Sequence, residues 1–476
     1  NMVNMRSDWC ISRQRRWGVP IPMLYCEDCG KPIISDTTIK AISDLFRAES
    51  SDAWYAKDAG EFIPADVKCE CGYNKFRKEM DIFDVWFDSG CTHAAVLKER
   101  PELSWPADMY LEGCDQYRGW FQSSLLTSVA TTGQAPYKAV CTHGWVVDGN
   151  GQQMHKSKGN QIFPEEVIKD FGADVLRLWV ASLDYHADIR VSKDMLKQLS
   201  ESYRKIRNTA RYILGNLNDN KGFDPDTEMV PFEKLRELDK WALARLDEVI
   251  DKVKASYEAF DYYLAYHALI SFCVVDMSNF YLDIVKDTLY CESADSPARK
   301  SVQTAMYVIL DALVRMIAPI LCYTADEIWQ FMPHKNDDDQ RSVIFNQMPE
   351  RTGVTADEEK WAKIHAVRED VLAALELKRA DKVIGKSLEA MVEIFTADES
   401  VKALESELAD ACIVSGVKVS TNGEGEYKGA ACSVTVTKKS GCACERCWKF
   451  DDTVGSDSKY ANLCKRCADV IKTHFE

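Results

Sequence analysis

The sequence has no apolar run of the roughly 18 residues that a membrane-spanning helix needs. Its most apolar stretch, around Leu310 to Cys322, is interrupted by Arg315 and Pro319. It has no charged-then-apolar secretory segment at its start, no internal repeat and no low-complexity tract. We therefore expect a cytoplasmic protein without a membrane partner.

Basic residues are in the minority, with 59 Lys and Arg against 75 Asp and Glu and a net charge of −16. This balance excludes a histone-like nucleic-acid binder, but it leaves room for a local basic face on an acidic body. The 18 cysteines in 476 residues are too sparse for a disulfide scaffold. Eight of them fall into two tight clusters, which in a cytoplasmic protein indicates metal sites.

The chain is long enough for about three domains, and its patterning changes along its length. Short apolar runs alternate with helical periodicity over residues 81–190, which indicates an α/β segment. From about Ser192 the periodicity is that of long amphipathic helices in a bundle. Residues 412–437 alternate as in a small sheet. The predicted helices are 37–48, those starting near 164 and 173, 235–253, 257–290, 299–331 and 357–380.

The tail predicts a four-thiolate zinc site. Cys444 and Cys447 form one CxxC pair, and after 16 intervening residues Cys464 and Cys467 form another. Such spacing suits tetrahedral zinc, whose binding would supply the folding energy that so short a polar segment lacks. Cys442 lies close enough to compete as a ligand. Two reduced pairs without metal are the alternative.

Residues 438–476 carry eight basic and six acidic side chains. Together with Trp448 and Phe450, which we expect to be exposed, this composition suggests a surface that faces nucleic acid. A solvated zinc knob is the alternative.

An earlier cluster also predicts zinc. Cys26 and Cys29 form a CxxC pair, whereas Cys69 and Cys71 are separated by a single residue. That spacing is tight, but Gly72 permits a sharp turn. A ribbon that kept its cysteines and lost the metal is the alternative.

Two further segments carry polar groups suited to a nucleotide and an amino acid. In a loop after Gly151, Lys156 as a point charge and Ser157 as a donor could clamp a triphosphate, although most lysine-rich loops are only solvated. Upstream, Glu112, Asp115 and Gln116 precede an apolar helix predicted from Ser123. They suit an ammonium group and ribose hydroxyls, and a helix start capped by Asp115 is the alternative.

Several runs resemble isoleucyl-tRNA synthetases in order and spacing, and together they cover essentially the whole chain. The run Asp8-Trp-Cys-Ile-Ser-Arg-Gln-Arg-Arg-Trp-Gly-Val-Pro-Ile-Pro22 looks like the segment that follows the editing insertion in that family. The others are Asp84-Val-Trp-Phe-Asp-Ser-Gly90, Glu112 to Phe121, the lysine loop, Arg204 to Thr209 and the terminal four-cysteine finger.

The resemblance implies a class I Rossmann-type catalytic domain, a helical anticodon-binding domain and a zinc finger. It implies activation of isoleucine with ATP and magnesium, then transfer to the cognate isoleucine tRNA by a monomer. Glu112 would hold the ammonium of the aminoacyl-adenylate, with Gly113, Asp115 and Gln116 alongside. Trp86 and Trp120 would wall the isoleucine side chain, and Lys156 with Ser157 would bind ATP, Lys156 stabilising the charge that develops on pyrophosphate.

The same resemblance predicts the domain boundaries. They are 1–25 for the return from the editing insertion, 26–80 for a zinc-ribbon-like insertion, 81–190 for the second half of the Rossmann domain, 191–395 for the anticodon-binding helices, 396–437 for a small α/β junction and 438–476 for the finger.

Two departures from the family stand out. The lysine loop of the family is usually Lys-Met-Ser-Lys-Ser, whereas Gln153 and His155 replace its first lysine and first serine here. The amino-terminal half of the family, with half of the ATP site, has no counterpart in the sequence, so we expect a carboxy-terminal piece that is inactive alone. The rival interpretation is a stand-alone tRNA- or zinc-binding protein, but it gives no reason for Glu112, Asp115 and Lys156.

Overall fold

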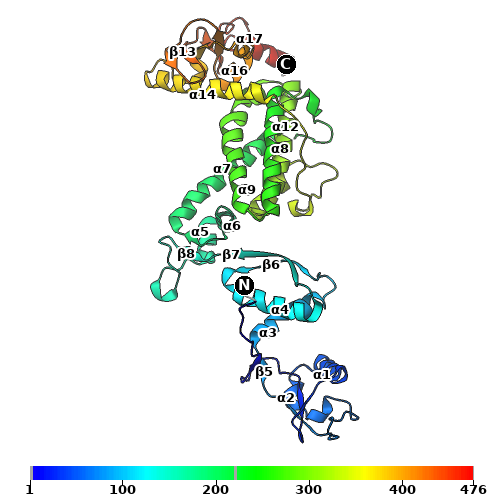
Figure 1. Ribbon diagram of the computed structural model, residues 1–476. Coiled ribbons are helices and arrows are strands. Elements are labelled where there is room, and N and C mark those ends of the chain that lie inside the picture. Colours follow the sequence, from blue (N-terminus) through cyan, green and yellow to red (C-terminus); the bar gives the residue numbers. More distant parts are fainter. Residues whose placement is uncertain (1–3, 219–221, 475–476) are drawn as a thin grey trace. The chain divides into compact units, whose positions relative to one another are not determined.

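The computed structural model describes residues 4–218 and 222–474 (Figure 1). They form two compact units. The first comprises Asn1–Trp145 and His186–Asp188, and the second comprises Val146–Tyr185 and Ile189–Glu476. The cut falls inside the segment 81–190 that the sequence assigns to one catalytic half.

The first unit begins with a small ribbon around a compact core. Strand β2 (Leu24–Cys26) pairs antiparallel with β3 (Pro32–Ile33) and β4 (Phe76–Lys78). Helix α1 (Asp36–Glu49), close to the predicted 37–48, starts at Ser35, whose Oγ accepts from the Thr38 amide at 3.2 Å. With α2 (Ala53–Ala56) these elements bury Trp54 and Phe62.

A parallel βαβ unit follows in the same body. Strand β6 (Ala107–Gly113) lies parallel to β7 (Tyr137–His143), and α4 (Trp120–Thr132) connects them. Helix α3 (Val85–Gly90) packs tightly on α4, since a Cβ at Gly90 would lie 2.8 Å from the Ser123 backbone carbon. Short strands β1 (Ser12–Arg13) and β5 (Ile82–Phe83) pair just before α3. The predicted α/β pattern is therefore present.

The second unit starts with another parallel strand pair, β8 (Val146–Asp148) and β9 (Ile189–Val191). Helices α5 (Pro164–Phe171) and α6 (Ala173–Ala181), both near their predicted starts, lie between these strands in sequence. The bundle follows, and its largest buried cluster joins most of its helices. The bundle helices are α7 (Lys193–Leu217), α8 (Glu237–Glu258), α9 (Tyr262–Ser271), α10 (Leu282–Ile284), α11 (Lys286–Cys291), α12 (Pro297–Ile317) and α13 (Cys322–Phe331).

Two predicted helices differ in extent. The helix expected over 257–290 starts only at Tyr262, because α8 ends in a turn where Phe260 has a positive φ of 60°. Between α9 and α10, Phe272–Tyr281 forms a π-helix in which the Ser278 hydroxyl donates to the Cys273 carbonyl at 2.7 Å. The helix expected over 299–331 is two helices, α12 and α13, because Pro319 cannot continue α12.

One described helix, Tyr262–Cys291, is long and apolar enough to cross a membrane, with a mean hydropathy of 1.5. In the folded chain 56% of its most apolar window is buried inside the structure. The expectation that no stretch is long and apolar enough for a span is therefore wrong for this helix. Core helices of soluble proteins have the same length and hydropathy, so this helix alone does not indicate a membrane span.

Beyond the bundle, α14 (Glu358–Ala380) supports a small sheet of strand order β11-β10-β13-β12 (Figure 1, yellow to orange). Its strands are β10 (Ala390–Phe395), β11 (Gly416–Ser420), β12 (Tyr427–Lys428) and β13 (Ser433–Lys438), with α15 (Glu399–Lys402) and α16 (Glu405–Cys412) between the first two. Strand β10 lies on the amino-terminal side of the boundary predicted at 395. The finger adds β14 (Cys442–Ala443), β15 (Phe450–Asp451) and α17 (Lys465–His474).

A carboxylate from α6 caps the start of α13. Asp174 is 6% exposed and accepts from the Thr324 amide at 2.7 Å, the Thr324 hydroxyl at 2.6 Å and the Tyr323 amide at 3.3 Å. In the same helix Arg177 donates to the carbonyls of Pro319 and Ile320, at 2.7 and 2.8 Å. These groups satisfy the backbone that the break at Pro319 leaves unpaired.

We expect Asp174→Ala to lower the free energy of unfolding of the second unit by about 2 kcal/mol, because it removes a charged cap from buried amides. Urea denaturation followed by helical circular dichroism measures the change. Asp337→Ala, at an exposed loop carboxylate, is the control and should change stability little. Equal effects of the two substitutions would contradict the capping role.

Candidate active site and metal centres

The first candidate site lies where β6 and β7 end. In this parallel pair Glu112 is opposite Thr142, and Gly113 is opposite His143. Glu112 is exposed, whereas Gly113 is buried and close to the Asp115 carboxylate, 2.7 Å from where a Cβ would lie. Ligands of open α/β sheets bind at the carboxyl ends of the strands. The position of Glu112 therefore suits an ammonium ligand.

A short 3-10 turn, Cys114–Arg118, connects β6 to α4 and fixes the next two side chains. The Gln116 amide group donates to Asp115 Oδ2 at 2.9 Å, and its oxygen accepts from the Trp120 backbone amide at 3.1 Å. The helix α4 is thus capped by Gln116, so the alternative that Asp115 caps it is wrong. Asp115 itself is exposed, with its carboxylate held beside Gly113.

The two predicted tryptophans approach each other around Gly119. The indole of Trp120 donates to the Ser89 carbonyl at 3.0 Å and stacks on Tyr110 with ring centroids 4.3 Å apart. A Cβ at Gly119 would lie 2.6 Å from the Gln116 amide oxygen and 3.4 Å from the Trp86 ring. The structure therefore brings Trp86, Gln116 and Trp120 together. Gly119 was not identified as a site residue from the sequence.

A buried carboxylate holds Trp86 and the amino-terminal run together. Asp84 accepts from the Trp9 indole at 3.0 Å and from the Trp86 amide at 3.1 Å, and it forms an ion pair with Arg13. Although burial opposes it, these donors and the nearby arginines hold the pKa of Asp84 below its usual value. Both runs were prominent in the sequence, but their contact was not predictable from it.

The lysine loop belongs to the second unit. Lys156–Lys158 form a 3-10 turn that ends at Gly159, whose φ of 65° favours glycine. The Asn160 side chain accepts from the His155 amide at 3.0 Å and donates to Asp148 at 2.8 Å and to the Gln153 carbonyl at 3.2 Å. Sequence reasoning did not identify Asn160 as the residue that closes the loop.

This arrangement leaves the charged end of the loop free to bind. The hydrogen bond from Asn160 and the amides of Gln152 and Asn150 hold the pKa of Asp148 below its usual value. Lys156 and Ser157 are exposed, and in the described part of the chain neither has a hydrogen bond or ion pair through its side chain. The ammonium group and the hydroxyl are thus available to phosphate oxygens.

Both cysteine clusters assemble four thiols. In the first, Sγ atoms of Cys26 and Cys71 are 3.6 Å apart, and those of Cys29 and Cys69 are 3.4 Å apart. All four ligand atoms lie within 4.8 Å of one another. Tetrahedral zinc with Zn–S bonds of about 2.3 Å separates its sulfurs by about 3.8 Å, so the group fits zinc.

The terminal cluster is similar but more buried. Cys444, Cys447, Cys464 and Cys467 are all buried, with the Sγ atoms of Cys447 and Cys464 3.9 Å apart. Cys442 is exposed on β14 and lies outside this group. The donor set therefore fits zinc with the predicted ligands.

The aromatic residues beside the finger differ from each other. Trp448 is 68% exposed, as expected, and has a positive φ of 60°. Phe450, which we expected to be exposed, is partly buried because it pairs with Ala443 in the β14–β15 hairpin.

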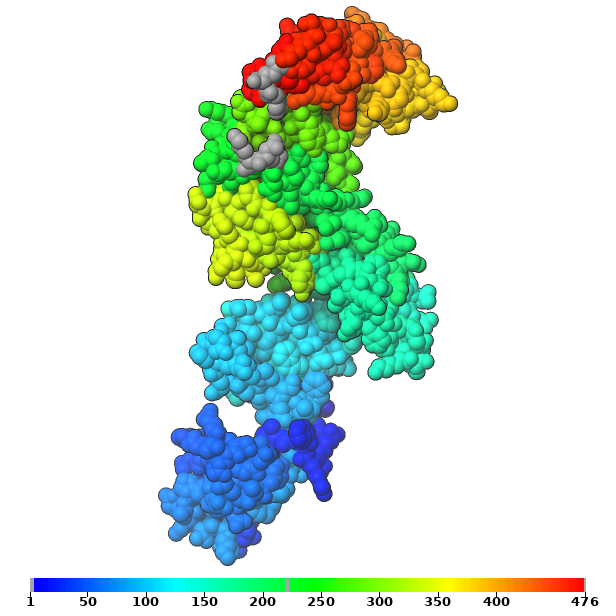
Figure 2. Space-filling view, turned by 180° about the vertical axis from the view of Figure 1, so that it is seen from behind, coloured from blue at the N-terminus to red at the C-terminus, as the bar shows by residue number. Residues whose placement is uncertain are grey.

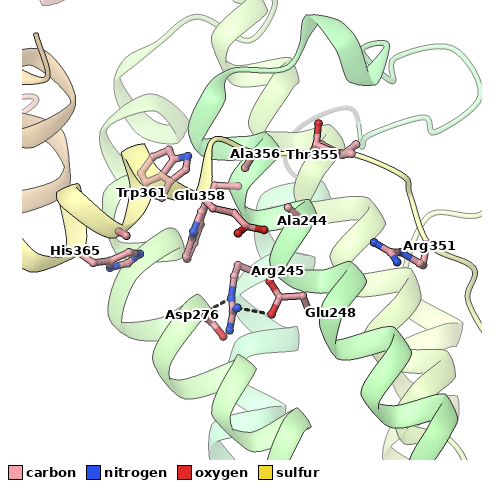
Figure 3. A pocket seen from close by; sticks show the side chains of 13 residues that line it. Ala244, Arg245, Glu248, Asp276, Arg351, Thr355, Ala356, Glu358, Trp361 and His365 are labelled. Carbon is pink, nitrogen blue, oxygen red and sulfur yellow. Dashed lines mark hydrogen bonds and ion pairs between the residues drawn. The ribbon is translucent and has the colours of Figure 1, made fainter. Parts of the chain in front are cut away.

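A pocket of about 570 Å³ opens on the bundle between α8, the π-helix and the start of α14 (Figure 3). Arg245 in its floor is held by Glu248 at 2.5 Å and by Asp276 at 3.4 Å. Burial is the main cause that raises the pKa of Asp276. Trp241 and Trp361 supply aromatic faces, with ring centroids 5.7 Å apart. The sequence pattern did not predict this pocket, because its residues come from distant helices.

Three family models match the chain. They are tRNA synthetases class I (I, L, M and V) over residues 1–192, the anticodon-binding domain of tRNA ligase over 239–394, and the zinc finger found in FPG and IleRS over 443–470. The predicted order of an α/β catalytic segment, a helical domain and a zinc finger is thereby confirmed.

Curated relatives match along the whole chain. The isoleucine–tRNA ligase of Caldanaerobacter subterraneus is 51% identical, over 100% of this chain and 52% of the relative. Those of Caldicellulosiruptor bescii and Geobacter sulfurreducens are 52% and 49% identical, each over 99% of this chain and 51% and 52% of the relative. The chain thus spans about half the length of the curated relatives it matches.

A solved structure, the ternary LeuRS-tRNA-LeuAMS complex of Agrobacterium radiobacter, is similar in fold. It has a TM-score of 0.52 at 19% identity, over 82% of this chain and 45% of that chain.

We expect purified protein, prepared without chelator, to contain two zinc ions per chain, because each four-thiol group fits one. Elemental analysis measures the ratio, and Cys69→Ser should lower it to about one by removing a ligand of the first site. A ratio near one that Cys69→Ser leaves unchanged would show that only the terminal cluster binds zinc.

Proposed function

We propose, on the premise that this chain belongs to the isoleucine–tRNA ligase family of class I synthetases, that it takes part in activating isoleucine with ATP and transferring it to isoleucine tRNA. The observation that carries the proposal is 51% identity to one such ligase across the entire chain, from the catalytic segment to the finger. The proposal includes that the enzyme containing this segment is cytoplasmic and monomeric.

In this proposal the turn after β6 and the two tryptophans bind the amino acid. The Glu112 carboxylate, at the end of β6, binds the ammonium of isoleucine. Asp115 and Gln116 bind the adenylate alongside it, and Gly113 lets the backbone approach. Trp86 and Trp120 form the apolar walls for the side chain. The hydrogen bonds of Gln116 and of the Trp120 indole hold these groups in place before the ligand arrives, which favours reaction by positioning.

In the same proposal the lysine loop binds the phosphates of ATP. An isoleucine carboxylate oxygen bonds to the α-phosphorus of ATP while the bond to pyrophosphate breaks, and negative charge grows on the leaving group. The exposed ammonium of Lys156 and the hydroxyl of Ser157 stabilise that charge, and Mg²⁺ enters with ATP. Gln153, at the position of a family lysine, carries no charge to contribute.

The rival function, a tRNA- or zinc-binding protein without enzymatic activity, needs neither Glu112 nor Lys156. Both proposals include tRNA binding by the helical region and the finger. Isoleucine-dependent ATP–pyrophosphate exchange separates them, since only an enzyme segment can restore it.

We expect no exchange from this chain alone, because the half of the relatives that lies outside the match would hold the rest of ATP. Adding that half of a relative, as a fusion or in trans, should restore exchange. In the restored enzyme Lys156→Ala should lower the exchange rate roughly 100-fold, as the loss of one charged transition-state contact does. Gln153→Ala is the matched control and should change it little. Exchange by the isolated chain would refute the proposed division, and equal effects of the two substitutions would refute the role of Lys156.

We also expect the chain to bind tRNA through local basic surface, with an affinity that falls steeply as salt rises, since phosphate contacts release counterions. Deleting residues 438–476 should weaken binding while the helices stay folded. Filter binding at several salt concentrations, with circular dichroism as the folding control, measures both. Unchanged affinity after the deletion would leave the finger without a part in tRNA binding.

A further inference from the structure

A fifth thiol lies against the terminal cysteine cluster. Cys291, the last residue of α11, is 3% exposed and packs in the same buried cluster as the four finger cysteines. Its Sγ donates to the Arg446 carbonyl at 3.7 Å, and the Arg446 guanidinium donates in return to the Cys291 carbonyl.

A second arginine of the finger holds the same helix. Arg466 donates from both terminal nitrogens to Asp287, at 2.6 and 2.7 Å. Asp287 lies four residues before Cys291, so both side chains are on one face of α11. Figure 2 shows the finger, in red, directly against the green residues of the bundle.

The two knuckles of the finger are built alike. In Cys444-Glu-Arg446-Cys447 and in Cys464-Lys-Arg466-Cys467, an arginine stands immediately before the second cysteine. Because bound metal would fix the backbone of each knuckle, it would also fix the direction in which the arginine of that knuckle points. Both arginines end on α11, one on a backbone carbonyl and one on a carboxylate.

We propose that Cys291 is a positioning residue of the terminal zinc site, whose thiol donates a hydrogen bond to the Arg446 carbonyl, between the ligands Cys444 and Cys447. With Asp287 it locks the finger to the bundle, so that zinc binding and docking of the finger are coupled. Cys291 lies far from both CxxC pairs in sequence, and it is not a zinc ligand. Hydrogen bonds just outside the ligand atoms orient the ligands and tune metal affinity. The proposal requires that the finger hold zinc, and it does not depend on the catalytic proposal.

The test compares Cys291→Ala, Cys291→Ser and Cys432→Ala in the full chain carrying Cys69→Ser, so that zinc release reports the terminal site. Cys432 is a buried thiol beside β13 and outside the finger cluster, which makes it a matched control. An excess of a chromogenic chelator measures the release rate. Cys291→Ala should release zinc about 10- to 100-fold faster than the control. Cys291→Ser should stay within about threefold of it, because a hydroxyl also donates to the Arg446 carbonyl.

Two further readouts separate positioning from simple packing. In cobalt-loaded protein, Cys291→Ala should shift the sulfur-to-cobalt charge-transfer band and Cys291→Ser should restore it. Hydrogen exchange of the α11 amides should speed up on chelation. Zinc release from Cys291→Ala at the control rate would overturn the proposal. Equally fast release from the Ala and Ser variants would also overturn it, by showing that volume and not the hydrogen bond matters.

Discussion

The helical half of the chain depends on how the break at Pro319 is satisfied. A proline there ends α12 and leaves carbonyls on one side and amides on the other without partners. One turn of α6 supplies both kinds of partner. The Arg177 guanidinium donates to the carbonyls, and the Asp174 carboxylate accepts from the amides. Because α6 follows the lysine loop in sequence, this clamp ties the loop-bearing segment to the bundle.

At the end of β6, too, one side chain makes two structural contacts. One amide side chain, Gln116, caps α4 and restrains Asp115, and the glycine at position 119 lets Trp86 and Gln116 approach the chain closely. Asp115 and the start of α4 are therefore held by contacts within one short turn, whereas the Trp120 indole is held by the Ser89 carbonyl. A side chain at Gly119 would move Trp86 and Gln116 away, although Gly119 itself offers no chemical group.

The features that could be predicted from the sequence are those that depend on residues close together in the chain. Helix periods and the CxxC spacings are local, and the structure agrees with them apart from two helices. The helix predicted over 257–290 starts at Tyr262, and the one predicted over 299–331 is broken at Pro319. Contacts between residues far apart were not accessible, as with Asp84 and Arg13, Asp174 and Thr324, or Cys291 and Arg446. The pairing of β10 escaped prediction because its partners β11 and β13 come later in the chain. The catalytic roles of Glu112 and Lys156 came from resemblance and remain predictions.

The π-helix of Phe272–Tyr281 has a geometric consequence for the finger. A π segment accommodates a residue more per turn than an α-helix, so it acts as an insertion carried inside a continuous helix. Loss of one residue there would turn everything downstream by about 100° around the helix axis. The face of α11 that carries Asp287 and Cys291 would then point away from both arginines. The register of this ten-residue π-helix thus decides which face of α11 the finger can contact.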